Sequence, residues 1–78
     1  MLNIKYLVIC VNENQDVCSV DSYNTVEEAN LALAEDARKT YEEIEDHDLS
    51  SIEVSDGDAE VVDGEAVWRW SISPLAIE

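Results

Sequence analysis

Residues 4–11 read IKYLVICV, and this stretch decides the fold because seven of its eight residues are apolar. It is rich in β-branched and aromatic side chains and too short for a helix in a soluble core, so it predicts a central β-strand. Both sides of this strand are apolar, with Ile4, Tyr6, Val8 and Cys10 on one face and Leu7, Ile9 and Val11 on the other. A sheet covered by a single helix leaves its second face to solvent. We therefore expect that face to be covered, either by residues 75–77 or by another chain in a homodimer.

The next segment predicts a β-hairpin. Residues 12–16, NENQD, are turn formers, and residues 17–20, VCSV, alternate weakly, which gives a hairpin with a five-residue loop. Cys10 and Cys18 are symmetric about Asn14, so we expect them directly opposite one another on one face, a geometry that permits a cross-strand disulfide. The alternative is two small buried apolar side chains in a reducing cytoplasm.

A capping box predicts where a helix begins. In Thr25-Val26-Glu27-Glu28 the Thr hydroxyl can accept from the third backbone N–H while the Glu reaches back. Apolar residues then recur at three- and four-residue spacing, which predicts one amphipathic helix of about five turns over residues 26–45. They are Val26, Ala29, Leu33, Ala37, Tyr41 and Ile44. Its C-terminal end carries several Glu residues, which the helix dipole disfavours there, so we expect that end to fray.

Three further strands follow. Residues 51–55 alternate cleanly and lie either in the sheet or apart from it, residues 59–62 are strand-like, and residues 66–73 form the last strand, which Pro74 ends. Asp56-Gly57-Asp58 and Asp63-Gly64 predict the turns between them. Trp68 and Trp70 share the face that packs against the helix, and an exposed Trp there would be an anchor in a protein interface.

This order, β-β-α-β-β-β, predicts the fold class. We expect an α+β fold in which an antiparallel sheet of four to five strands carries one amphipathic helix on one face. A chain of 78 residues is too short for a doubly wound sheet or a barrel, so residues 1–78 form one small acidic domain.

The charge of the chain excludes several classes of partner. There are 19 Asp and Glu residues against 4 Lys and Arg, for a net charge of −15. Direct DNA or RNA binding needs cations that displace the counterions of phosphates, and an anionic membrane surface repels the chain. No apolar run approaches the roughly 20 residues that span a bilayer, and the run at 4–11 lacks the cleavage site of a signal peptide. We expect a cytoplasmic protein.

Acidic residues are densest between positions 42 and 65, where 11 of them occur without any Lys or Arg. They are Glu42, Glu43, Glu45, Asp46, Asp48, Glu53, Asp56, Asp58, Glu60, Asp63 and Glu65. Apolar residues are interleaved with them at strand spacing, so the carboxylates are expected on a folded scaffold. Carboxylates held in this way lose less entropy on binding than mobile ones. We predict that these residues bind a partner.

Catalytic and metal sites find no support in the sequence. His47 lies among acids that should raise its pKa, but no nucleophile accompanies it, and a solvated loop position is the better interpretation. The spacing of a calcium loop is absent around residues 46–48 and 56–58, and a single His with two Cys does not make a zinc site. We expect neither an enzyme nor a cofactor.

In its size, its acidity and its lack of a catalytic motif, the chain resembles the small inhibitor proteins that phages and mobile elements use against host defences, including anti-CRISPR and anti-restriction proteins. The resemblance concerns overall character and no aligned motif, so no residue is carried over from it. It implies a DNA mimic that occupies the basic nucleic-acid channel of a host nuclease or CRISPR-type effector, in the host cytoplasm if the protein is phage-encoded.

Two functions follow from these observations. The first is a non-enzymatic acidic module that docks on a basic nucleic-acid-binding protein or complex. A sphere of this chain length is about 30 Å across, so the net charge of −15 amounts to roughly one negative charge per 2 Å of its diameter. Duplex DNA carries one negative charge per about 1.7 Å of its axis. The alternative is an acidic structural or oligomeric domain of a salt-adapted organism, in which the charge serves solubility.

Overall fold

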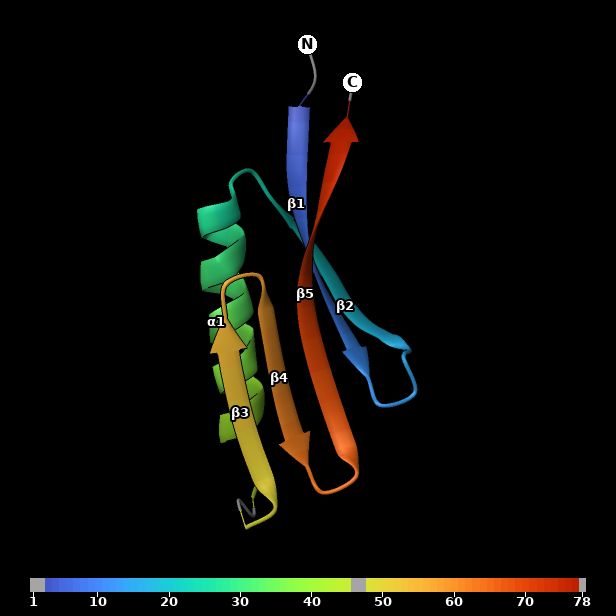
Figure 1. Cartoon of the computed structure of the whole chain (residues 1–78), viewed down its shortest axis with the longest axis vertical. Helices are drawn as coiled ribbons and strands as arrows, with labels where there is room; N and C mark the ends of the chain where they lie inside the picture. Colours follow the sequence, from blue (N-terminus) through green and yellow to red (C-terminus); the bar gives the residue numbers. More distant parts are fainter. Residues whose placement is uncertain (1–2, 46–47, 78) are drawn as a thin grey trace.

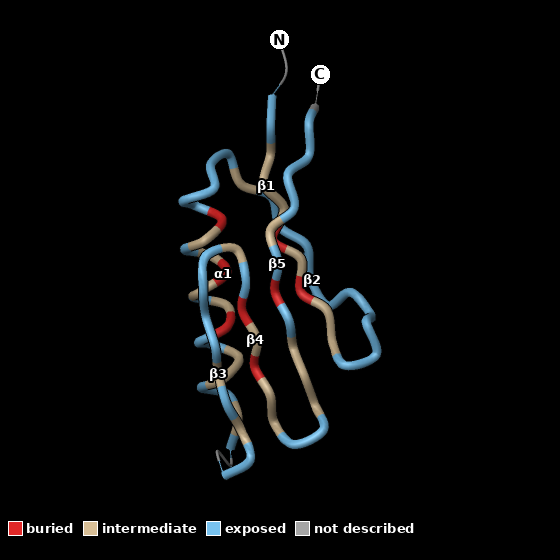
Figure 2. Tube along the Cα trace, in the orientation of Figure 1, coloured by how far each residue is buried: buried red, intermediate tan, exposed pale blue. Residues whose placement is uncertain are grey.

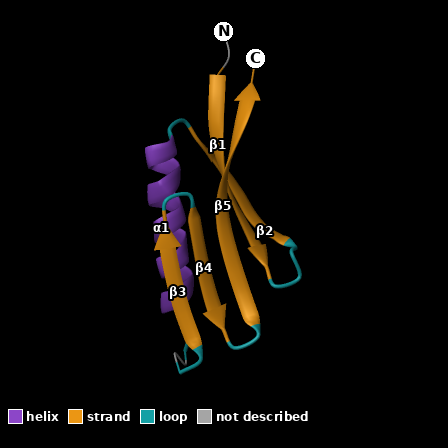
Figure 3. Ribbon diagram, in the orientation of Figure 1, coloured by secondary structure: helices purple, strands orange, loops and turns teal. Residues whose placement is uncertain are grey.

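The computed structural model describes residues 3–45 and 48–77, with the backbone alone at position 77. Its elements are β1 (Asn3–Asn12), β2 (Val17–Tyr23), α1 (Val26–Glu42), β3 (Ser50–Ser55), β4 (Asp58–Asp63) and β5 (Ala66–Ile77). The strands form one antiparallel sheet in the order β2-β1-β5-β4-β3, and α1 lies against one face of it (Figures 1 and 3). The predicted α+β class and element order are confirmed. Strand β3 joins the sheet at its edge and does not lie apart.

The last strand is longer than predicted. β5 continues through Pro74 and pairs with β1 from Trp68 opposite Asn12 to Ile77 opposite Asn3. The ladder between β4 and β5 stops at Ser71, which is opposite Asp58, the first residue of β4. Beyond Ser71, β5 has no neighbour on its β4 side, so Pro74 removes no hydrogen bond of that ladder. The prediction that Pro74 ends the strand was therefore wrong. The C-terminal residues extend the sheet as an arm paired with β1 and do not fold over its second face (Figure 1).

The core lies between α1 and the sheet (Figure 2). Its buried residues are Val8, Cys10, Ala29, Leu33, Ala37, Ala59, Val61 and Trp70. The helix begins as predicted, because the Thr25 Oγ1 accepts a hydrogen bond of 3.1 Å from the Glu28 backbone N–H. It ends at Glu42, before the predicted residue 45, at the end where the dipole disfavours carboxylates. Within the described ranges, no helix is both long and apolar enough to cross a membrane.

The two cysteines lie on the same face, as predicted, and line one hollow together, but they are not directly opposite in the ladder. The β1–β2 ladder shifts register between Cys10 and Val11, so Cys10 pairs with Ser19 while Val11 pairs with Val17. Cys18 is the extra residue of this bulge. It is exposed, Cys10 is buried, and both thiols are free. The symmetric spacing about the loop assumes a hairpin without a bulge, and the bulge removes that symmetry.

Two glycine turns and one side chain fix the β3–β4–β5 meander against α1. Gly57 and Gly64 adopt φ values of +79° and +62°, in the region that favours glycine. The Asn30 Oδ1 of α1 accepts a hydrogen bond of 2.7 Å from the Gly57 N–H. At the other end of the hairpin, the Gly64 N–H donates to the Leu49 carbonyl at 3.0 Å. The meander is thereby tied to the helix at one end and to the segment that leads into β3 at the other.

Candidate functional site

The predicted acidic residues do not form one continuous surface. Six of them gather at the end of the molecule where α1 ends and β4 turns into β5. These are Glu42, Glu43, Glu45, Asp48, Asp63 and Glu65, which we call the acidic end. Glu53, Asp58 and Glu60 lie on the sheet face opposite α1, as their register with β5 and with one another shows. Asp56 lies in the β3–β4 turn, and Asp46, like His47, lies outside the described residues.

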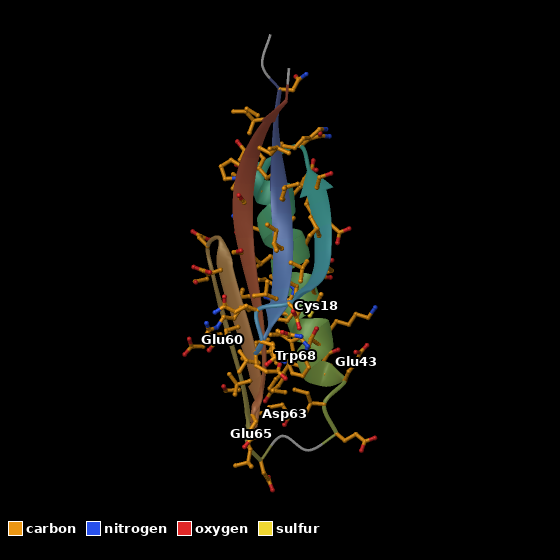
Figure 4. The ribbon with its side chains drawn as sticks, turned by 90° about the vertical axis from the view of Figure 1, so that its right-hand side faces the viewer. Cys18, Glu43, Glu60, Asp63, Glu65 and Trp68 are labelled. Carbon is orange, nitrogen blue, oxygen red and sulfur yellow. The ribbon has the colours of Figure 1, made fainter. Side chains whose placement is uncertain are left out.

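Backbone hydrogen bonds explain why the acidic end forms. The Glu43 N–H caps α1 by donating to the Lys39 carbonyl at 3.1 Å. Asp63 pairs with Ser50 in the β3–β4 ladder, and the Gly64–Leu49 bond holds the neighbouring segments together. The Gly64–Leu49 bond places the start of β3 beside the β4–β5 turn, and the hollow that Glu43 and Asp63 line together places the helix end there as well. Figure 4 shows Glu43, Asp63 and Glu65 at this end, close to Trp68.

An open hollow of about 580 Å³ lies within the acidic end. It is lined by Thr40, Glu43, Ile44, Glu45, Asp63 and Trp68. Trp68 is half-buried, whereas Trp70, two residues along on the same face of β5, is part of the core. An aromatic side chain is therefore accessible between three carboxylates. A guanidinium or ammonium group placed there would meet both a ring face and a negative charge.

A second hollow continues from the first along the helix. It has a volume of about 410 Å³, shares Thr40, Glu43 and Trp68 with the first, and reaches Asp21 on β2 and Asp36 on α1. Burial, and then the charge of Asp21, raise the pKa of the Asp36 carboxyl, while Lys39 opposes the shift. Ionisation of Asp36 is thus disfavoured in the free chain, and a cation of a bound partner would favour it again.

Asp21 and Asp36 were not among the predicted site residues. They are separated by the helix start and belong to different elements, so only the packing of α1 beside β2 brings them together. The pKa of Tyr23 is raised by burial first and then by the charges of Asp21 and Asp36. We call Asp21, Asp36 and the acidic end together the anionic surface.

The chain has too few cations to balance its carboxylates. Four Lys and Arg cannot pair with 19 Asp and Glu, and within the described residues no polar or charged residue is buried. The ion pair between the Arg69 Nε and the Glu60 Oε2, at 2.7 Å, lies on the opposite side of the sheet. Figure 4 shows Glu60 on that side and Glu43 on the α1 side.

Acidic side chains are also distributed unevenly. On the face opposite α1, the described strand residues of β2, β1 and β5 include no Asp or Glu, and Glu13 of the β1–β2 loop is the acidic residue that reaches this half, beside Val67. The molecule is elongated, with extents of 50 × 23 × 16 Å, and is not the sphere that the sequence predicts. Spread along 50 Å, the net charge of −15 is one per about 3.3 Å, half the density of duplex DNA. A close match to DNA therefore requires the local concentration found on the anionic surface.

No protein-family model, no curated protein and no solved structure matches the chain. Across residues 3–45 and 48–77, no three His, Cys, Asp or Glu side chains lie close enough together to hold a metal ion. The geometry and charge of the anionic surface are therefore the structural features that bear on function.

Proposed function

We propose that the chain is a non-enzymatic binding module whose anionic surface docks on a basic nucleic-acid-binding groove of another protein. In this function it is a DNA mimic that inhibits a nuclease or a CRISPR-type effector of a host cell, in the cytoplasm. The observation that supports the proposal is the concentration of carboxylates around the half-buried Trp68, on a frame of α1, β4 and β5.

Carboxylates form charge-assisted, often bidentate hydrogen bonds with Arg, the residue that basic grooves use to hold phosphates. Because Asp63 is held in a strand ladder and Glu43 at a helix cap, little backbone entropy is lost on binding. A strongly negative surface also accelerates association with a positive one, and salt weakens this effect.

The second candidate function is an acidic structural or oligomeric domain of a salt-adapted organism. The observation that favours it is that Glu53, Asp56 and Asp58 lie away from the anionic surface, as charges that serve solubility would. Circular dichroism in dilute buffer and in multimolar salt separates the two functions. A DNA mimic is folded in dilute buffer, whereas a salt-adapted domain unfolds there.

A displacement assay tests the proposed function. A fluorescent DNA duplex is bound to each of a panel of purified nucleases and CRISPR-type effectors, and the chain is added as competitor. We expect displacement from at least one of them, and we expect it to weaken as salt is raised. The double variant Glu43→Lys/Asp63→Lys should displace the duplex at least about 100-fold less well.

The matched control is Glu53→Lys/Asp58→Lys, which changes the net charge by the same amount on the opposite sheet face. It should compete within about threefold of the parent chain, because rim charges outside an interface contribute little. If both double variants competed equally poorly, binding would not be specific to the anionic surface, and this would contradict the proposal. Failure to displace DNA from every member of the panel would contradict the proposed inhibition of these proteins.

A further inference from the structure

The two cysteines of the chain lie next to one another at the bulge between β1 and β2. A bulge sets two residues of one strand opposite a single residue of its partner, here Cys18 and Ser19 opposite Cys10. Both cysteines line the hollow of about 410 Å³ that lies beside α1. The bulge removes the symmetric pairing of the cysteines but leaves both side chains on one face of the sheet.

The two thiols also interact directly. Burial raises the pKa of Cys10 to about 12, and the next causes are the charge of Cys18 and a hydrogen bond between the two side chains. Thiols that share a hydrogen bond have their sulfur atoms close to contact. A disulfide between them therefore needs no large movement of the backbone.

The two thiols differ in exposure. Cys18 is exposed, whereas Cys10 is only 4% exposed. A small oxidant in solution therefore reaches Cys18 first, and Cys10 lies behind it. An accessible thiol and a second cysteine beside it are two features of thiols that respond to oxidants.

The charge of the hollow selects the kind of oxidant. Asp21, Asp36 and Glu43 line it together with the thiols, against the single cation Lys39. An anionic oxidant such as glutathione disulfide is repelled from such a site. Hydrogen peroxide is uncharged and small, so it reaches Cys18 without this penalty.

We propose that Cys10 and Cys18 are the site of a reversible disulfide, which a peroxide forms and a small uncharged dithiol removes. In the first step the Cys18 thiolate attacks one oxygen of hydrogen peroxide. An S–O bond forms, the O–O bond breaks, and the leaving hydroxide takes up the proton that Cys18 released. Cys18 is thereby oxidised by two electrons to a sulfenic acid, and the peroxide is reduced to water.

In the second step the sulfur of Cys10 attacks the sulfur of Cys18. The S–S bond forms, the S–O bond breaks, and the leaving hydroxyl takes the proton of Cys10 to become water. This step does not depend on a free Cys10 thiolate, which burial makes scarce. Two thiols and one peroxide thus give one disulfide and two molecules of water. A dithiol reverses the bond by exchange and is itself oxidised to a disulfide. The bond forms whether or not the anionic surface binds a partner.

Peptide mapping of the folded parent chain tests the disulfide. The reduced chain is treated with hydrogen peroxide in dilute solution, the remaining thiols are alkylated in urea, and a protease that cleaves after Glu is added without reductant. Cleavage after Glu13 separates the two cysteines, so only a disulfide keeps their peptides joined. We expect a single chain that has lost two hydrogen atoms, joined peptides, and their separation by dithiothreitol. Glutathione disulfide should form the bond more slowly than peroxide does.

Two variants separate the roles of the thiols. Cys10→Ala retains the exposed thiol alone, so its sulfenic acid should persist and react with dimedone at least about tenfold more than in the parent chain. In Cys18→Ser the buried Cys10 should stay unmodified at the same peroxide concentration. Circular dichroism verifies that each variant is folded.

The parent chain also shows whether its fold favours the bond. In a dithiothreitol redox buffer, the disulfide should resist reduction at least about tenfold more in the folded chain than in urea, because a fold that holds the thiols together stabilises their bond.

Three results would overturn the proposal. One is a peroxide-treated parent chain whose Cys18 is oxidised while its peptides stay separate. Another is dimedone labelling of the parent chain equal to that of Cys10→Ala, because Cys10 would then not react with the sulfenic acid. The third is equal resistance of the bond to reduction in the folded chain and in urea.

Discussion

Leu33 is the position at which the packing of α1 on the sheet is most open to a quantitative test. It is fully buried, and the other two fully buried residues of α1 are Ala29 and Ala37. Leu33 is therefore the one large side chain among the buried residues of the helix. The same helix carries Asp36, Glu42 and Glu43, so the anionic surface depends on this contact.

We expect Leu33→Ala to cost about 4 kcal/mol. Truncation of a buried Leu costs about 2.7–5 kcal/mol, and the upper half of this range applies because the flanking alanines cannot fill the cavity. The free energy of unfolding of a chain of 78 residues is about 4–12 kcal/mol. The loss is therefore a third or more of the total, and it should lower Tm by about 15–30 °C.

Urea unfolding followed by Trp fluorescence and far-UV circular dichroism measures this loss. Both tryptophans lie on the sheet face beneath α1, so their emission reports helix packing. The control is Leu31→Ala, the same change two residues earlier at a position that is 66% exposed, and it should stay within about 0.5 kcal/mol of the parent chain. A cost below 1 kcal/mol for Leu33→Ala, or equal costs for the two variants, would refute the assigned packing of the helix.

Three further predictions concern charge and the thiols. The pKa of Asp36 is raised above its ordinary 3.8, so its ionised form destabilises the fold at pH 7 and this cost disappears below pH 3.8. Asp36→Asn should therefore raise Tm at pH 7 but not at pH 3, and thermal melts should show a smaller gain for the exposed control Asp56→Asn; equal gains would argue against the burial of Asp36. Burial, together with Cys18 and Asp36, raises the pKa of Cys10 to about 12. A thiol reagent at pH 8 should therefore modify Cys18 in the folded chain and Cys10 only after unfolding, and mass spectrometry after proteolysis would detect the reverse order. Finally, Tm should rise between 0.02 M and 1 M NaCl as salt screens self-repulsion, with the chain folded throughout, and a flat response would mean that the carboxylates do not repel one another appreciably.

Most of the fold is predictable from local patterns. The continuous apolar run of residues 4–11 identifies β1, the capping box at Thr25 identifies the start of α1, and the glycines at 57 and 64 identify the turns. The errors have tertiary causes. Pro74 is expected to end β5, but the ladder between β4 and β5 already stops at Ser71, so the proline does not interrupt it. The bulge at Cys18 changes the register of β2 without any glycine to signal it.

The candidate site was less predictable than the fold. The segment 42–65 does contain Glu43 and Asp63, which meet at the acidic end. Alternation within β3 and β4 sends Glu53 and Glu60 to the opposite face, and sequence density alone does not show this. Asp36 joins Asp21 only because α1 packs beside β2, a contact that no sequence pattern in either segment indicates.

The most direct test of the anionic surface is an NMR titration of the labelled chain with an arginine-rich peptide at low and at moderate salt. It does not require the identity of the partner. We expect the largest shift changes at the Trp68 indole and at the backbone amides of Glu43, Asp63 and Asp36, with little change in Glu53, Asp58 and Val20. Changes of similar size at Glu53 and Asp58 would show that the charge of this chain is diffuse, and would contradict the claim that its carboxylates form a located binding surface.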